Sequence, residues 1–226
     1  MGVIFFRNKL DANMKRFGKF SKRIVHKLSA KYSVKVIYSS KKSKYIASLN
    51  SNDTFVIISH GSSKQIYHRF IKYGANHQNL LDITNPPCNA GNIIAISCGT
   101  ARELGPKYVE SGICKAYLGF STKLHFDKKN SKSSFVSPYY SRELKEIYKS
   151  VFEKVLLEAI SNSWSFGKTA RVMDYELRKT AIQRVLNVKQ KYPHYYIAKE
   201  IVQILVAVTS VSNGIVVLGD TNQKVK

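Results

Sequence analysis

The hydrophobic residues of this chain fall into short runs that alternate with longer segments of helical period. The runs at 54–58 and 93–97 have almost no polar side, a pattern typical of strands covered on both faces in a parallel sheet. Three further runs, at 33–40, 113–121 and 214–219, are rich in Val, Ile and aromatic residues and also predict strands.

Between these runs, apolar residues recur three or four positions apart, which is the spacing of an amphipathic helix. This period predicts helices at 17–32, 100–111, 142–160, 166–189 and 195–209, with a short helix at 42–53. Strands and helices that alternate in this way predict an α/β fold, in which a largely parallel sheet is flanked by helices on both faces.

The length of 226 residues and the apolar fraction of 44 % predict one globular domain over residues 1–226. Residues 1–30 are expected to form an N-terminal helical extension, and the polar segment 126–141 an exposed loop. No apolar run approaches the roughly 18 to 20 residues of a membrane span. The first residues also lack the basic-then-apolar order of a secretory signal, so a cytoplasmic protein is expected.

The formal net charge of +23 is the strongest compositional feature of the chain. Such a charge attracts nucleic acid, anionic lipid or an acidic protein. The lysines are spread along the whole sequence without a nucleic-acid-binding motif, so any contact with nucleic acid is expected to be non-specific. The three cysteines have neither disulfide-framework nor zinc-ligand spacing, and we expect no metal and no cofactor.

Two predicted strands end on residues that can do chemistry. His60 closes the run "FVIISHG" and Cys98 closes "NIIAISCG", and each is followed directly by a glycine. The carboxyl ends of parallel strands share one edge of the sheet, where ligands bind. The pair therefore suggests acyl transfer, with Cys98 as nucleophile, His60 as acid and base, and the amides of Gly61 and Cys98 as oxyanion hole. The alternative is a structural histidine beside a core cysteine.

These two motifs resemble those of the caspase-like cysteine peptidases (clan CD), and of their CHAT branch in particular. Three further segments are similar to this family: "ARELGPKYVESGICKAYLGFS", "EAISNSWSFGKTARVMDYELRKT" and "GIVVLGD". The match extends from about Val34 to Asp220, and it is carried by the order and spacing of the motifs together. The resemblance implies a caspase-like sheet and the same roles for His60, Cys98 and Gly61.

The residues that would select the substrate depart from the family. In relatives that cleave after Arg or Lys, an acidic residue a few positions past the "YLGF" glycine lines the pocket. Lys123 occupies that place in an ungapped count, and Asp127 is the nearest acid. Asp53 is a second candidate acid, or an ordinary turn residue in "SNDT". In this family the segment equivalent to 126–141 builds the substrate groove and often carries activation sites.

The resulting hypothesis is a cysteine endopeptidase that cleaves a protein substrate. Activation is expected from a separate activator or sensor protein, from oligomerisation or from loop cleavage, and the family suggests bacterial antiviral defence or cell death. Two alternatives remain open at this point. One is a catalytically silent caspase-like module that binds partners, and the other is a basic nucleic-acid-binding protein.

Overall fold

A computed structural model describes residues 2–38, 52–69, 78–84, 91–124, 138–191 and 198–226. Its main sheet has six strands in the order β2-β1-β3-β6-β7-β8. Five of them are parallel, and only β8 runs antiparallel to its neighbour β7. The strands are β1 (Val3–Arg7), β2 (Val34–Tyr38), β3 (Thr54–Ile58), β6 (Gly91–Ile96), β7 (Cys114–Phe120) and β8 (Ile215–Gly219). The predicted α/β fold with a largely parallel sheet is confirmed.

The central strands are buried over their full length. All five residues of β3 and all six of β6 are buried, as are those of β1. Strands covered on both faces need apolar side chains at consecutive positions, which explains the runs of unbroken hydrophobicity in the sequence.

The expectation that residues 1–30 form an N-terminal helical extension is wrong. Residues Val3–Arg7 form β1, which lies inside the sheet between β2 and β3. The helical part of this region consists of α1 (Ala12–Phe17) and α2 (Phe20–Leu28). A run as short as "VIFFR", with four apolar residues before Arg7, carries no periodic signal that separates strand from helix, and its pairing with β2 and β3 decides its structure.

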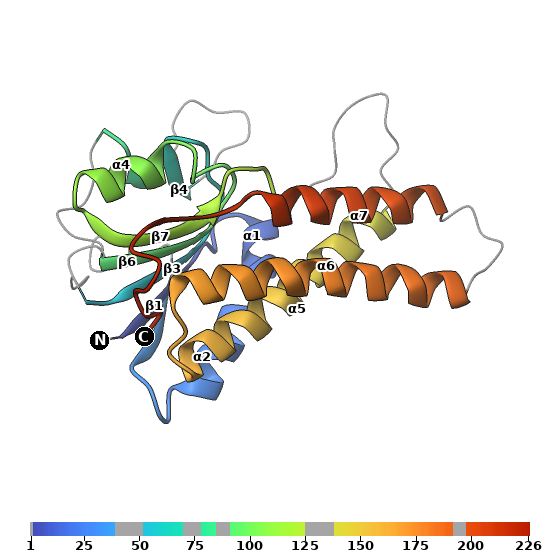
Figure 1. The fold of residues 1–226 in the computed structure, drawn as a ribbon, viewed down its shortest axis with the longest axis horizontal. Helices are drawn as coiled ribbons and strands as arrows, with labels where there is room; N and C mark the ends of the chain where they lie inside the picture. Colours follow the sequence, from blue (N-terminus) through green and yellow to red (C-terminus); the bar gives the residue numbers. More distant parts are fainter. Residues whose placement is uncertain (1, 39–51, 70–77, 85–90, 125–137, 192–197) are drawn as a thin grey trace.

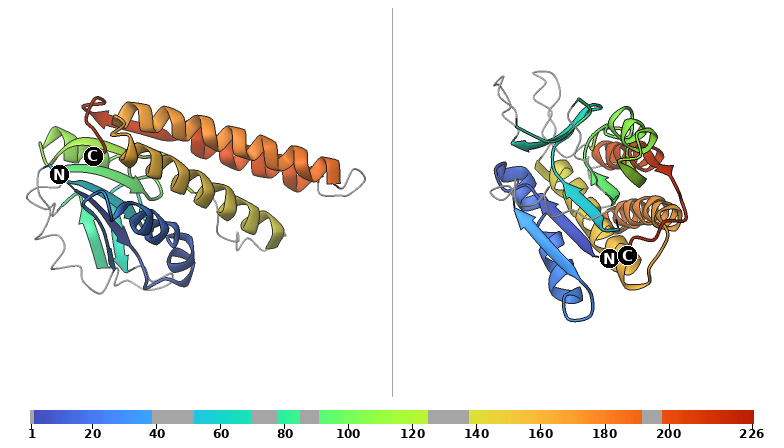
Figure 2. Two further views of the ribbon diagram at one scale, coloured as in Figure 1. Left: turned by 90° about the horizontal axis from the view of Figure 1, so that it is seen from below. Right: turned by 90° about the vertical axis from the view of Figure 1, so that its left-hand side faces the viewer.

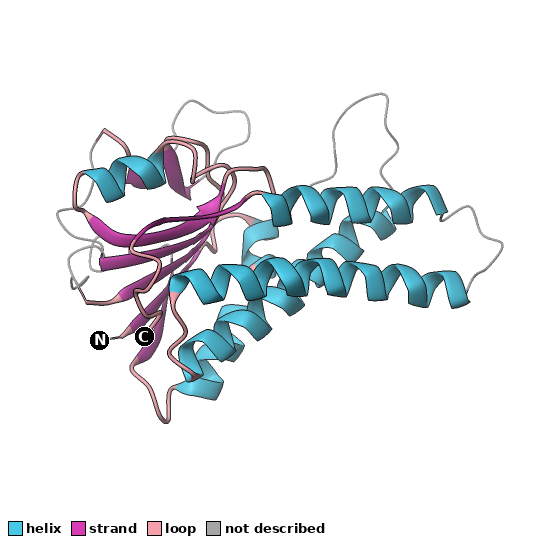
Figure 3. Cartoon of the chain, in the orientation of Figure 1, coloured by secondary structure: helices cyan, strands magenta, loops and turns pink. Residues whose placement is uncertain are grey.

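Different elements cover the two faces of the sheet (Figures 1 and 3). One face packs on α1, α2, α5 (Pro138–Ser161), α6 (Phe166–Lys191) and α7 (Ala198–Asn213) around the larger hydrophobic core. The other face packs on α4 (Leu104–Glu110) and on the antiparallel hairpin of β4 (Gln65–Arg69) and β5 (Gln78–Asp82). The expected helices on both faces are therefore present.

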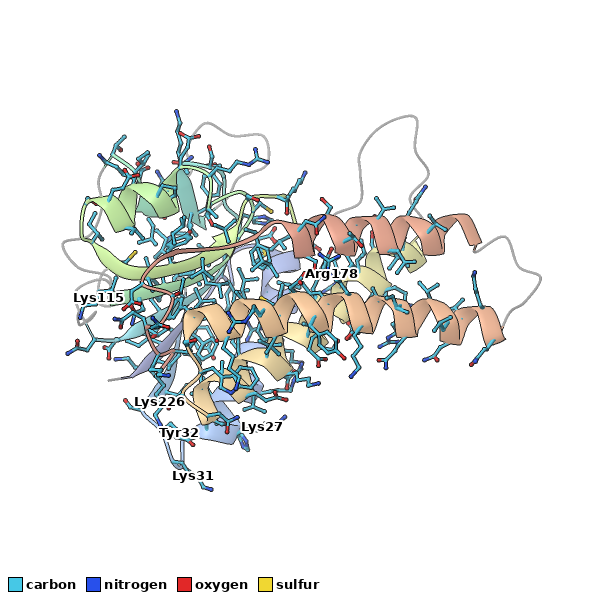
Figure 4. The ribbon with its side chains drawn as sticks, in the orientation of Figure 1. Lys27, Lys31, Tyr32, Lys115, Arg178 and Lys226 are labelled. Atoms are coloured by element: carbon cyan, nitrogen blue, oxygen red, sulfur yellow. The ribbon has the colours of Figure 1, made fainter. Side chains whose placement is uncertain are left out.

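The long helices α5, α6 and α7 extend well beyond the edge of the sheet (Figures 1 and 2). Helices α6 and α7 run antiparallel, and α5 packs against both of them. Arg178 Nη2 on α6 donates to Asn213 Oδ1 on α7 at 2.6 Å, close to where the pair leaves the sheet (Figure 4). Ser212 also donates to Asp174. These bonds fix the register of the two helices.

The hairpin β4–β5 was not predicted, because its strands "QIYHR" and "QNLLD" are short and partly polar. Most of the predicted helix 42–53 and of the predicted loop 126–141 lies outside the described residues. Residues 138–141 already belong to α5. Among the described residues, no helix is both long and apolar enough to cross a membrane.

Candidate active site

The register of β3 and β6 brings His60 and Cys98 to the same level of the sheet. The two strands are parallel neighbours, and the last paired residues are Ile58 and Ile96. His60 and Cys98 each follow their strand by two residues beyond that pair. Adjacent strands lie about 4.8 Å apart, so the two chain segments leave the sheet side by side at its carboxyl edge. The structure thus brings together the two residues that the sequence singles out.

A buried row of polar side chains fixes these strand ends. Asn8 follows β1, Ser59 follows β3 and Ser97 follows β6, and each is at most 2 % exposed. Asn8 Nδ2 donates to Ser59 Oγ at 3.0 Å, and Ser97 Oγ donates to the Ser59 carbonyl at 2.9 Å. Ser59 Oγ donates in turn to the Tyr67 carbonyl of the hairpin. Buried hydrogen bonds of this kind hold three neighbouring strands in one geometry directly below His60 and Cys98.

His60 contacts a carboxylate that sequence reasoning missed. Its Nε2 lies 3.3 Å from Oδ1 of Asp11, which is the N-cap of α1. The same oxygen accepts a hydrogen bond from the Met14 amide at 2.8 Å, so the cap holds the carboxylate in place. The His60 carbonyl accepts from the Tyr67 amide at 3.0 Å. The N-cap of α1 therefore contacts the ring of His60, and the hairpin strand β4 binds its backbone.

Cys98 lies in the turn between β6 and α4. Gly99 has a φ of +68°, a conformation that L side chains rarely adopt. Its amide donates to the Thr122 carbonyl at 3.0 Å, and the Leu124 amide donates to Cys98 Sγ at 3.3 Å. The segment 121–124 that follows β7 thus contacts the turn twice. The thiol of Cys98 is therefore held by a backbone donor from that segment.

Gly61 lies against the turn that carries Cys98. A Cβ atom at Gly61 would come within 2.8 Å of Thr100 Cγ2 and within 3.0 Å of Ser97 Cβ. Gly61 pairs with Ile66 in an isolated antiparallel bridge, and the two hydrogen bonds of that bridge are formed by the residues on either side. A residue in such a non-hydrogen-bonded pair does not use its amide in the ladder. The N–H of Gly61 therefore donates no hydrogen bond within the hairpin.

Tyr148 of α5 is an electrostatic neighbour of Cys98. Burial raises the pKa of its phenol, and negative charge on Tyr140 and Cys98 raises it further. The side chain of Tyr148 is fully buried in the larger core, against which Cys98 also packs. The thiol thus lies at the boundary between the hydrophobic core and the carboxyl edge of the sheet.

The three candidate specificity residues have different locations. Lys123 is exposed and lies between Thr122 and Leu124, the two residues that contact the Cys98 turn. Asp53 is at the amino end of β3, at the opposite edge of the sheet from His60. There its carboxylate accepts from the Gly2 amide at 2.7 Å, so the proposed role of Asp53 in the substrate pocket is wrong. Asp127 lies outside the described residues.

An open groove lies next to this edge on the side of α7. Its lining residues are Thr122, Leu205, Val206, Thr209, Ser210 and Asn213. Thr122 Oγ1 donates to the Ser210 carbonyl at 3.3 Å and joins the end of β7 to α7. The described part of the chain contains no group of three His, Cys, Asp or Glu side chains that could hold a metal ion.

Fold and site together define an α/β protein with a His–Cys pair, supported by a carboxylate, at the carboxyl edge of a mostly parallel sheet. Comparison of the chain with protein-family models, with curated proteins and with solved structures finds no match.

Proposed function

We propose that this protein is a cysteine endopeptidase of the caspase-like type, with Cys98 as nucleophile and His60 as general acid and base. The observation that carries the proposal is the register of β3 and β6, which places both residues two positions beyond the paired residues Ile58 and Ile96. Two reactive side chains at equal heights on adjacent strands can act on one bond.

The first chemical step is attack on a peptide carbonyl. Cys98 gives its proton to His60, and the thiolate sulfur forms a bond to the carbonyl carbon. The carbonyl oxygen becomes an oxyanion, toward which the amides of Gly61 and Cys98 would donate. The tetrahedral species then expels the amine, which takes the proton from His60, and leaves an acyl-thioester on Cys98.

The second step releases the other product. His60 removes a proton from water, and the hydroxide attacks the thioester carbon. The carbon–sulfur bond breaks, the carboxylic product leaves, and the proton returns to the sulfur. Asp11 acts as a positioning residue in both steps, because its carboxylate contacts Nε2 and stabilises the imidazolium that forms in each.

The surroundings of Cys98 favour a substrate that is not basic at the cleavage site. Lys123 is exposed beside the Cys98 turn, and the groove on the α7 side is lined by neutral residues. A carboxylate that would bind Arg or Lys is not found among these residues. The proposal includes a separate activator or sensor protein, a cytoplasmic location and a role in antiviral defence or cell death, all by analogy with the resembled family.

Two other functions compete with this proposal. A catalytically silent module of the same fold would retain the geometry but form no covalent adduct. A nucleic-acid-binding protein would use the net charge of +23, and its affinity would fall steeply with salt. Salt-sensitive nucleic-acid binding that survives Cys98→Ala, without any peptidase activity, would favour that second function.

The decisive experiment measures covalent labelling and cleavage with a positional library of peptides, with and without candidate partner proteins. Wild-type protein should form an adduct on Cys98 with electrophilic versions of the cleaved peptides, and Cys98→Ala should neither react nor cleave. Cys114→Ala is the matched control, since Cys114 is a second cysteine that is only 3 % exposed. Cleavage that persists in Cys98→Ala would overturn the mechanism.

A further inference from the structure

Helices α6 and α7 carry large apolar side chains that are exposed to solvent. Each of these residues is between 50 % and 64 % exposed. We call this set the α6–α7 ridge; it consists of Tyr175, Ile182, Leu186, Val202 and Val206. Single exposed apolar residues are common, but a continuous apolar patch on one face marks an interaction site.

The ridge residues lie on one face of the helix pair. Tyr175, Ile182 and Leu186 are seven and four positions apart, so they line one side of α6. Val202 and Val206 do the same on α7. The bonds Arg178–Asn213 and Ser212–Asp174 set the antiparallel register, in which Ile182 is about level with Val206 and Leu186 with Val202. Both stripes lie on the sides of their helices that face away from the core residues Leu177, Ala181, Ile204 and Val208, so at this register they are neighbours on the outer side of the pair.

The packing of helix α5 shows that the α6–α7 pair can bind a further helix. Helix α5 packs against α6 and α7 (Figures 1 and 2), and its ion pairs Lys154–Glu176 and Glu143–Arg184 involve a side of α6 other than that of the ridge residues. The α6–α7 pair is thus the middle layer of a helical stack whose second side is left apolar within the described part of the chain. A pair of antiparallel helices presents a groove that an amphipathic helix fills with its apolar face.

The basic residues beside the ridge indicate which charge a partner would carry. Helix α6 has seven Lys and Arg residues against two acids, a net charge of +5. Arg171, Lys179 and Lys189 are exposed one turn from a ridge residue, and within the described residues they form no salt bridge. The two acids are already engaged, since Asp174 binds Arg178 and Glu176 binds Lys154.

We propose that the α6–α7 ridge docks an acidic amphipathic helix of a partner protein. The aliphatic centre of the ridge takes the apolar face of that helix, and the flanking cations take its carboxylates. A second copy of this chain is disfavoured because it would bring another +23 charge to a basic surface. Nucleic acid is disfavoured because the centre of the ridge is aliphatic, whereas bases stack on aromatic or Arg side chains.

The ridge also borders the candidate active site. Val206 is a ridge residue and lines the same groove as Thr122, whose carbonyl accepts from the Gly99 amide beside Cys98. A helix docked on the ridge would therefore reach the segment that holds the catalytic turn. The docking itself does not depend on catalysis, and it can be tested in a protein that cannot cleave.

The test uses the full chain carrying Cys98→Ala and a displayed library of amphipathic 20-residue helices whose polar faces vary from acidic to basic. Selected peptides are resynthesised, and their affinity is measured by fluorescence anisotropy. The ridge variant adds Val202→Asp and Val206→Asp to the Cys98→Ala chain. Gln183→Asp is the matched control, because it adds negative charge to an exposed position of α6 outside the ridge.

We expect the selected peptides to carry an acidic polar face and to bind about tenfold more weakly to the ridge variant, as for loss of an interface anchor. Gln183→Asp should change affinity by less than about twofold, and added salt should weaken binding. If circular dichroism finds that the Asp variant melts early, Val202→Ala with Val206→Ala replaces it. Selection of neutral or basic helices, equal binding by the variants, no enrichment, or a dimer lost on ridge substitution would each overturn the proposal.

Discussion

Asp11 Oδ1 lies 3.3 Å from His60 Nε2, although the two residues are 49 positions apart in the sequence. The contact exists because β1 and β3 are adjacent parallel strands, and both residues follow the carboxyl ends of those strands. With Cys98 after β6, an acid, an imidazole and a thiol follow the ends of three neighbouring strands of the sheet. This order matches the sequence of roles in a nucleophile–base–acid mechanism.

Replacement of Asp11 should separate its role as the N-cap of α1 from its role as the carboxylate beside His60. Asn is as good an N-cap as Asp, so Asp11→Asn should keep the stability of α1 while it removes the charge beside His60. Peptidase activity should fall by about 10- to 100-fold, as expected for a misplaced catalytic group. Asp11→Ala should lose the cap as well and cost about 1 kcal/mol of unfolding free energy. Full activity of Asp11→Asn would show that the carboxylate serves only the helix.

Gly61→Ala should disturb the contact between the segment that carries His60 and the turn that carries Cys98. The added methyl group would meet Thr100 Cγ2 at 2.8 Å and Ser97 Cβ at 3.0 Å, so the segments must move apart. Overpacking of this kind costs about 1–3 kcal/mol, which urea denaturation can measure. We expect activity to fall along with stability.

Gly99→Ala is the comparison for that substitution. Its methyl group has room, since the nearest atoms are 3.7 Å away, but the φ of +68° is strained for alanine by about 1–2 kcal/mol. The two variants therefore test a steric and a conformational effect on the same loops. A Gly61→Ala protein with wild-type stability and activity would contradict the packing described here.

The two described cysteines should differ in reactivity. Burial raises the pKa of the Cys114 thiol to about 12, and its side chain lies inside the smaller core. Cys98 is partly exposed and receives the Leu124 amide. Iodoacetamide at pH 8 should therefore modify Cys98 before Cys114 in the native protein, as read by peptide mass spectrometry. In urea both cysteines should react. Equal rates of modification of Cys98 and Cys114 in the native protein would contradict the partly exposed position described for Cys98.

Stability should decline in alkaline solution. Burial raises the pKa of Cys114 and of the phenols of Tyr108, Tyr117 and Tyr148. Above about pH 9 the unfolded chain loses these protons while the folded chain keeps them. The unfolded state then binds fewer protons, so the free energy of unfolding falls as pH rises.

Urea midpoints measured between pH 8 and pH 11 check this dependence. Tyr117→Phe should reduce the slope because it removes one buried phenol. A midpoint that stays constant up to pH 11 would show that these groups are not protected by the fold.

The fold and the two central site residues could be predicted from the sequence because their signal is local. Both faces of β3 and β6 are covered, so each strand appears as an unbroken apolar run, and His60 and Cys98 end these runs. β1 was missed because its four apolar residues and Arg7 carry no period. Asp11 stayed hidden for a related reason, since its N-cap position is visible in the sequence but its proximity to His60 depends on which strands are neighbours.

The substrate pocket was the least predictable part. Asp53 and His60 flank the same strand, but a strand of five residues separates them to opposite edges of the sheet. Position relative to a strand end, rather than closeness in sequence, decides which residues can meet. Lys123 reaches the site because β7 ends beside β6, a relationship that depends on the sheet order.

The sheet order also determines when the site can form during synthesis. β1 and β3 emerge early and can bring Asp11 to His60, whereas the thiol arrives only with residue 98 and its neighbour β7 later still. Helices α5, α6 and α7 of the larger core and the edge strand β8 come last. A nascent chain can therefore place the carboxylate and the imidazole side by side before the thiol and the segment 121–124 that contacts it have been made.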